Sequence, residues 1–185
     1  YSHNAKNPIY NLRYQLKNQI DRVNDTIPKL DIKLRDYEIQ NGEKLLKSMF
    51  REEKPIISIF TYATGDKCLS KDWWRQLYSE IKNFEDNYNI LEILPVENVS
   101  QIDFMAKTYY SRDIREIASV MCNAKIFIGA DSGMMHLANS SNVTTIGLFS
   151  VTETEFYGVY GDKNININTD NNDINFIINA IKERI

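Results

Sequence analysis

The sequence predicts an α/β fold in which a mostly parallel sheet is covered by helices on both faces. Short β-branched apolar runs alternate with amphipathic helical stretches from Pro55 onward, and this alternation is typical of βαβ units. The strands are expected at 56–60, 89–94, 108–110, 125–130, 144–149 and 164–169. The helices between and after them are expected at 71–84, 100–106, 114–122, 132–140 and 173–185. Right-handed crossovers then bring every strand-to-helix turn to one edge of the sheet, where ligands bind in such folds.

The first part of the chain has a different pattern. Apolar residues recur at helical spacing over 5–23 and again over 35–50, with Pro28 between the two stretches and Gly42 as a weak point in the second. We therefore expect residues 1–53 to be a helical appendage or linker that packs on a domain spanning 54–185.

Composition excludes several classes of function. The net charge of -3 argues against nonspecific binding of nucleic acid, which needs a basic surface. Cys68 and Cys122 fit no metal-ligand spacing and are too few for a disulfide framework, so both are expected to be reduced. No apolar run is long enough to span a bilayer, and no signal peptide is recognisable. We expect a cytoplasmic protein, and the start at Tyr1 suggests an excised or processed fragment.

The most specific candidate site follows the clearest strand, 125–130. Asp131, Ser132 and Gly133 form a strand-to-helix turn, and His136 lies one turn later on the same side of the helix. The free amides and the dipole at such a helix start attract phosphate, and the imidazole can donate to a phosphate or a sugar hydroxyl. From spacing alone, a helix cap with a core histidine is the preferred interpretation.

Two further candidates follow the first two strands of the predicted sheet. Thr61, Thr64 and Lys67 come after strand 56–60 and can hold a diphosphate, although the spaced glycines of a P-loop are absent. Glu97 comes after strand 89–94, where an acid is suited to binding ribose hydroxyls. A solvated loop with a surface lysine and a solvated acid are the alternative interpretations. No zinc site is expected, because His136 has no cluster of histidines or cysteines near it in the sequence.

The stretch "AKIFIGADSGMMHLANSSNVTTIGLFS" resembles the donor-binding half of glycosyltransferase family 9, the lipopolysaccharide heptosyltransferase family. The family has a strand that ends in a D-[ST]-G-x-x-H-L-A turn and helix. The matching positions here are Asp131, Ser132, Gly133, His136, Leu137 and Ala138. Upstream, "DKCLSKDWWRQL" is similar to the family's lysine-to-tryptophan stretch at Lys67 and Trp74, and Glu97 falls near the family's ribose-binding acid.

This resemblance implies the carboxy-terminal, Rossmann-like half of a GT-B fold that binds a nucleotide-sugar donor, typically ADP-heptose, and needs no metal or other cofactor. The implied reaction is an inverting sugar transfer in the synthesis of lipopolysaccharide or another cell-surface glycan, in the cytoplasm or on the inner face of the membrane. Lys67 and His136 would stabilise the departing diphosphate as catalytic residues. Asp131 would orient the turn or hold a donor hydroxyl, while Thr61, Thr64, Glu97, Ser132 and Gly133 would help to bind the donor.

The sequence also departs from the family pattern. Ser150, Thr144 and Val159 replace a glycine and two prolines of the family, which leaves the base and the sugar open. About 53 residues cannot form a second Rossmann-like domain, so an acceptor domain for a glycolipid or glycan is expected to be missing. Two alternatives stay open. They are a non-enzymatic module that binds sugar nucleotides and a protein similar to nonhydrolysing sugar-nucleotide epimerases.

Overall fold

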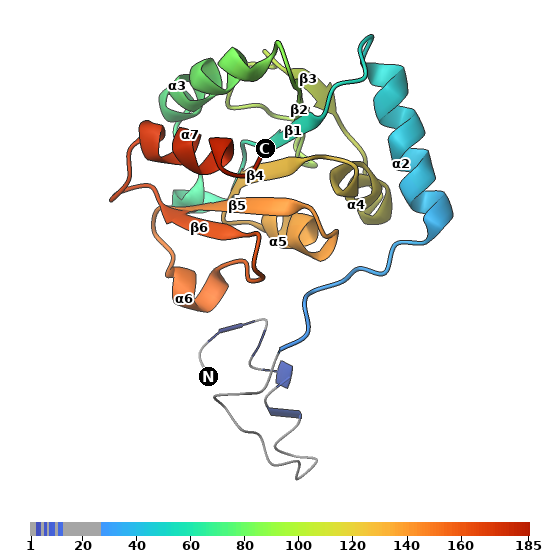
Figure 1. Ribbon diagram of the computed structural model, residues 1–185. Coiled ribbons are helices and arrows are strands. Elements are labelled where there is room, and N and C mark those ends of the chain that lie inside the picture. Colours follow the sequence, from blue (N-terminus) through green and yellow to red (C-terminus); the bar gives the residue numbers. More distant parts are fainter. Residues whose placement is uncertain (1–2, 5, 7, 10, 13–26) are drawn as a thin grey trace.

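The computed structural model describes residues 3–4, 6, 8–9, 11–12 and 27–185 (Figure 1). Six parallel strands form one sheet in the order β3-β2-β1-β4-β5-β6. They are β1 (Ile56–Phe60), β2 (Asn89–Ile93), β3 (Lys107–Tyr109), β4 (Ile126–Ala130), β5 (Thr144–Phe149) and β6 (Ile165–Asn168). This is the strand order of a Rossmann fold: the chain starts in the middle, runs to one edge, and returns past β1 to the other. The predicted α/β architecture is confirmed.

Helices cover both faces of this sheet (Figure 1). One face carries α3 (Lys71–Ile81) and α7 (Ile174–Lys182), and the other carries α4 (Ile114–Cys122) and α5 (Gly133–Ser140). Helix α2 (Asp36–Met49) lies outside α4 and packs along it. The short helices are η1 (Gly65–Lys67), η2 (Lys82–Phe84) and α6 (Thr154–Tyr157).

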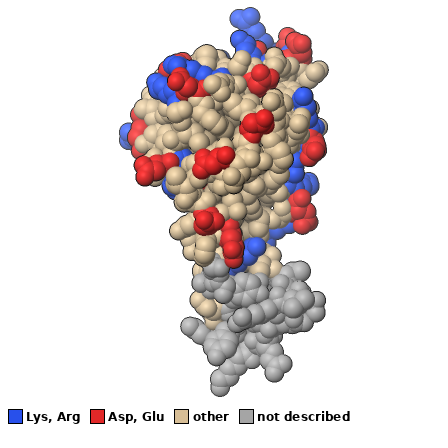
Figure 2. Space-filling view, turned by 90° about the vertical axis from the view of Figure 1, so that its left-hand side faces the viewer, with Lys and Arg blue, Asp and Glu red and all other residues tan. Residues whose placement is uncertain are grey.

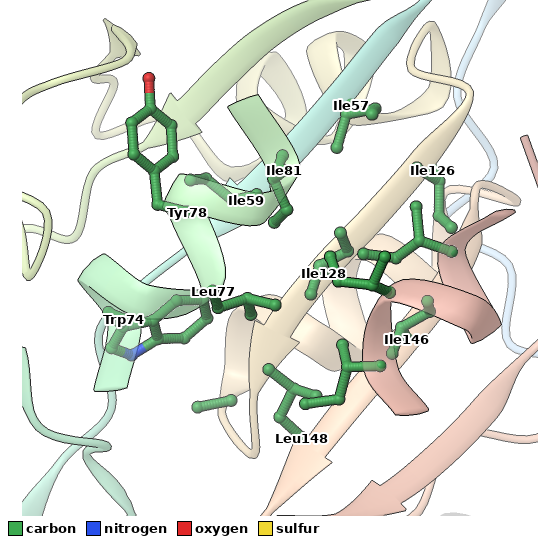
Figure 3. Packing of buried hydrophobic residues seen from close by; sticks show 14 of the residues in the cluster. Ile57, Ile59, Trp74, Leu77, Tyr78, Ile81, Ile126, Ile128, Ile146 and Leu148 are labelled. Atoms are coloured by element: carbon green, nitrogen blue, oxygen red, sulfur yellow. The ribbon is translucent and has the colours of Figure 1, made fainter. Parts of the chain in front are cut away.

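The core consists of two layers because successive side chains of a strand point to opposite faces. On the α3 and α7 face, alternate isoleucines of β1 and β4 meet Trp74 and Leu77, both fully buried (Figure 3). On the α4 and α5 face, Phe60 and Phe127 pack with Met135. Each such side chain contributes about 1.5–3 kcal/mol to the stability of the fold when it is fully buried. Burial on both faces is why the strands read as continuous apolar runs rather than as alternating ones.

Helix α2 approaches α4 closely at one glycine. A Cβ atom built on Gly42 would lie 2.2 Å from the backbone oxygen of Ser119 and 2.5 Å from its carbonyl carbon. The glycine that looked like a weak point in a helix is therefore the position at which two helix backbones meet. The second helix predicted in this part of the chain forms α2 and packs along α4, whereas the first, over 5–23, lies largely outside the described residues.

One predicted element is wrong. Residues 100–106 form turns rather than a helix, and Asp103 and Phe104 have left-handed backbone conformations with φ of 52° and 58°. The Ser100 hydroxyl accepts hydrogen bonds from the amides of Ile102 and Phe104, at 3.1 and 3.0 Å, and so takes the place of helical carbonyl acceptors. The sequence also gave no indication of the short helices η1 and α6.

Replacing Gly42 with alanine is expected to destabilise the protein by about 1–3 kcal/mol, since the added methyl group clashes with a backbone that cannot move aside easily. Without that clash, alanine would stabilise a helix relative to glycine. Chemical denaturation of the variant measures the change. The matched control is Asn41→Ala on the exposed side of the same helix, which is expected to be neutral or slightly stabilising. A Gly42→Ala variant as stable as the wild type would contradict the close α2–α4 approach.

Candidate functional site

A cavity opens where the strand order reverses, between the ends of β1 and β4. The loops after these two strands lead to helices on opposite faces of the sheet, so they separate and leave a crevice. The cavity has a volume of about 900 Å³ and is bordered by the segments that follow β1, β2, β3 and β4. The predicted site residues that line it are Thr64, Lys67, Glu97, Ser132, Gly133 and His136.

The amino-terminal end of α5 forms one wall of this cavity. Ser132 is the N-cap residue, and its Oγ accepts a hydrogen bond from the amide of Met135 at 3.4 Å. A Cβ atom built on Gly133 would have no neighbouring heavy atom within 4 Å, so the missing side chain leaves the backbone open to the cavity. The first amides of the helix therefore face a space that can hold an anion.

His136 lines the same wall one turn further along α5. Burial lowers the pKa of its imidazole below the usual 6.5. Asp131 acts in the opposite direction, and electrostatic interactions with His3 and Lys67 add to the lowering. His136 is therefore neutral at pH 7 and offers one N–H donor rather than a positive charge.

Lys67 is one of two cationic residues, with Arg112, among the described residues that line the cavity, and it is held by a buried acid. Its Nζ lies 3.5 Å from Oδ2 of Asp131, whose side chain is 5% exposed. The hydroxyl of Thr152, in the loop after β5, donates to the same oxygen at 2.7 Å. Asp131 itself is not among the residues that line the cavity, so it orients the Lys67 ammonium there rather than facing a ligand directly.

Thr61 does not reach the cavity, contrary to the prediction. Its side chain turns into the protein, where its hydroxyl donates to Oε1 of Glu92 at 2.6 Å and accepts from the amide of Gln101 at 3.0 Å. Ser100 donates to both oxygens of this fully buried carboxyl group, at 2.9 and 2.8 Å. Burial raises the pKa of Glu92, and the hydroxyl hydrogen bonds oppose that rise. The hydroxyl of Thr61 is thus committed to a structural network.

Other lining residues were missed by the sequence analysis. Ser111 and Arg112 follow β3, and the Nε of Arg112 donates to the hydroxyl of Tyr110 at 3.0 Å. Their position after a strand was a usable signal, because all strands of a parallel sheet end at the same edge. Leu30 comes from the segment before α2 and could not be assigned to the cavity from the pattern of the strands. Thr152, which supports Asp131, follows a strand in the same way as Ser111 does.

The surrounding surface carries no large basic patch in the view of Figure 2. The figure shows the left-hand side of Figure 1, and that face is largely uncharged, with separate acidic and basic side chains. Attraction of an anion to the cavity therefore depends on local groups, namely Lys67, Arg112 and the first amides of α5.

None of the helices in the described part of the chain is long and apolar enough to cross a membrane. Among the same residues, histidine, cysteine, aspartate and glutamate side chains form no group of three or more that is placed to hold a metal ion.

Solved structures share this fold. The chain is similar to a glycosyl transferase of family 9 from Veillonella parvula DSM 2008, with a TM-score of 0.75 and 15% identity over 100% of this chain and 54% of that one. It is also similar to the E. coli ADP-heptose lps heptosyltransferase II, with a TM-score of 0.67 and 12% identity over 90% and 55% of the two chains. It is similar as well to the E. coli heptosyltransferase WaaC with ADP, with a TM-score of 0.54 and 18% identity over 77% of this chain and 47% of that one. The chain spans about half the length of these proteins.

Sequence comparison identifies the family. No curated protein matched the chain. The family model described as glycosyltransferase family 9 (heptosyltransferase) matches residues 22–177, which is well over half of the chain. The protein therefore belongs to glycosyltransferase family 9, the heptosyltransferase family.

Proposed function

We propose that this chain binds a nucleoside-diphosphate sugar, with ADP-heptose as the first choice of donor, for an inverting sugar transfer that needs no metal. One observation carries the proposal: Lys67, the start of α5, His136 and Glu97 line a single cavity at the switch point of the sheet. A cation, free amides, a neutral donor and an acid are the groups that a diphosphate, a sugar and a ribose require.

The diphosphate is assigned to the space between Lys67 and the first amides of α5. When the bond between the sugar and the diphosphate breaks, negative charge develops on the leaving oxygen, and fixed donors that face it lower the barrier. Lys67 supplies a full positive charge, and the amides near Ser132 and Gly133 supply partial ones. Asp131 keeps the ammonium in place without occupying the cavity.

His136 is assigned to a phosphate or sugar oxygen beside the departing group. As a neutral imidazole it donates one hydrogen bond to that oxygen, and the positive charge of the cavity comes from Lys67 and Arg112. Glu97, which follows β2 on the other side of the cavity, is assigned to the ribose hydroxyls. The uncharged remainder of the donor would contact the apolar residues of the lining, which include Val96, Ile114 and Met134.

The relatives support this choice of donor class. The names of two similar structures refer to ADP-heptose and to bound ADP, respectively. An acceptor hydroxyl would attack the anomeric carbon from the face opposite the diphosphate and invert its configuration. We propose that a glycolipid or glycan acceptor, and the base that activates it, are held by a separate acceptor domain. Synthesis of lipopolysaccharide or another cell-surface glycan, in the cytoplasm or at the inner face of the membrane, is the proposed setting.

The first test is the binding of ADP to the purified chain by calorimetry. Lys67→Ala is expected to weaken binding by about tenfold or more, because a hydrogen bond between two charged groups contributes about 1.5–3 kcal/mol. The matched control is Lys71→Ala, which removes an exposed lysine that pairs with Asp103 at 3.1 Å outside the cavity. This variant is expected to bind ADP as the wild type does. The affinities of the wild type for UDP and GDP, measured in the same way, show which nucleotide base the cavity prefers. If the wild type bound none of the three nucleotides, the proposal would be wrong.

The second test uses the titration of His136. Burial disfavours its protonated form in the free protein, whereas a bound diphosphate favours that form, so binding is coupled to proton uptake. Between pH 8 and pH 6, the affinity of the wild type for ADP is expected to rise more than that of His136→Asn. The extra rise is expected to reach up to about tenfold, the equivalent of one pKa unit. Asparagine keeps an N–H donor but does not titrate, and the ionisation of ADP itself cancels in the comparison. Parallel pH profiles would place His136 away from the phosphates.

A further inference from the structure

Residues 27–35, which we call the strap, connect the amino-terminal part of the chain to α2 without forming a helix or strand. In Figure 1 the strap runs beneath α5 and α4 on its way to α2. Its residues are exposed or half-buried, so apolar packing alone does not hold it in place. Its position depends on a small number of directional contacts.

Helices α4 and α5 and the side chain of Tyr160 anchor the strap through its backbone. The amide of Ile32 donates to the carbonyl oxygen of Ser140 at the end of α5, at 3.0 Å. The hydroxyl of Tyr160 donates to the carbonyl oxygen of Pro28 at 3.1 Å. Arg115 in α4 donates to the carbonyl oxygens of Ile32 and Lys33, at 3.1 and 2.9 Å. The strap is thus fastened on both sides of Leu30.

Arg115 also fixes the start of α2. Its Nε and Nη2 donate to the two carboxylate oxygens of Glu38 at 2.5 and 2.6 Å, a bidentate arrangement. This contact lowers the pKa of Glu38 to about 2. Oε2 of Glu38 also accepts from the amide of Arg35, the last residue of the strap, at 2.7 Å. One guanidinium therefore joins the strap, α2 and α4.

The anchors place Leu30 in the wall of the donor cavity. Ile117 from α4, and Leu137 and Ser140 from α5, line the same cavity. Because the strap is bonded to both of these helices, it bridges them on the side of the cavity that they form. Leu30 is the strap residue that lines the cavity.

We infer that Leu30 is a donor-contacting residue of the cavity, that Arg115 is the residue that positions it, and that docking of the strap is coupled to nucleotide binding. The inference rests on the proposed function, because it takes the ligand to be a nucleotide. A ligand that contacts Leu30 binds the docked strap better than the undocked one, so it shifts the strap toward the docked state. By reciprocity, loosening the strap weakens binding of the ligand by the same factor.

The test combines ADP calorimetry with amide hydrogen exchange on the full chain. Leu30→Ala is expected to weaken ADP binding by about three- to tenfold through lost apolar contact, and Leu30→Met is expected to restore it. Arg115→Gln is expected to weaken binding to a similar degree without touching the ligand. The matched control is Arg75→Gln, which removes an exposed arginine that pairs with Asp103 at 2.6 Å away from the cavity. This control is expected to bind ADP normally.

Two further readouts separate coupling from a general loss of structure. ADP is expected to slow exchange of the Ile32 amide in the wild type more than in Leu30→Ala. In the double variant, Arg115→Gln is expected to add little to the effect of Leu30→Ala, because the residue that it positions has already been removed. If Arg115→Gln does not fold, Leu30→Ala, Leu30→Met and the exchange data still decide the question.

The outcomes that overturn the inference are distinct from failure of the proposed function. If the wild type binds ADP and Leu30→Ala binds it equally well, Leu30 does not contact the ligand and the inference is wrong. If exchange of the Ile32 amide is the same with and without ADP, the coupling is wrong. If the wild type binds neither ADP nor UDP nor GDP, the proposed function fails, and the inference fails with it.

Discussion

The reversal of strand order between β1 and β4 is the constraint on which the rest of the site depends. The two strands are paired side by side, with Phe60 beside Gly129, but the chain leaves them for helices on opposite faces of the sheet. The backbone must therefore separate just beyond the last paired residues, which opens the cavity between the two loops. The contact between Lys67 and Asp131 is the ion pair that spans this separation, since one residue follows β1 and the other follows β4.

A second constraint acts one strand further out. Glu92 is a fully buried carboxyl group in the middle of the sheet, and burial of such a group costs free energy unless its oxygens accept hydrogen bonds. Thr61 and Ser100 supply those hydrogen bonds from the segments that follow β1 and β2. Glu97 lies between Glu92 and Ser100 in the sequence, so the network that satisfies Glu92 also restricts the loop that presents Glu97 to the cavity. An apparently structural group thus helps to set the geometry of the site.

The sequence predicted the sheet well because every central strand is buried on both faces and therefore appears as an unbroken apolar run. The turn from Asp131 to Gly133 was predictable for a similar reason, since a strand that changes abruptly into a helix must break at its polar residues. Local pattern did not reveal the direction of a side chain at the end of a strand, so Thr61 was assigned to the cavity although it points to Glu92. Leu30 was not predictable, because the strap reaches the cavity only through anchors on α4, α5 and Tyr160.

Neither the packing nor the backbone conformation of the fold requires a glycine at position 133. A Cβ atom at this position meets no other heavy atom within 4 Å, and the residue does not have the positive φ that would demand glycine. The fold itself therefore tolerates a larger residue there, and selection for glycine would come only from whatever occupies the cavity. For protein engineering, this makes position 133 a place to narrow the cavity stepwise, through alanine and serine, and so to alter which ligands fit it without disturbing the fold.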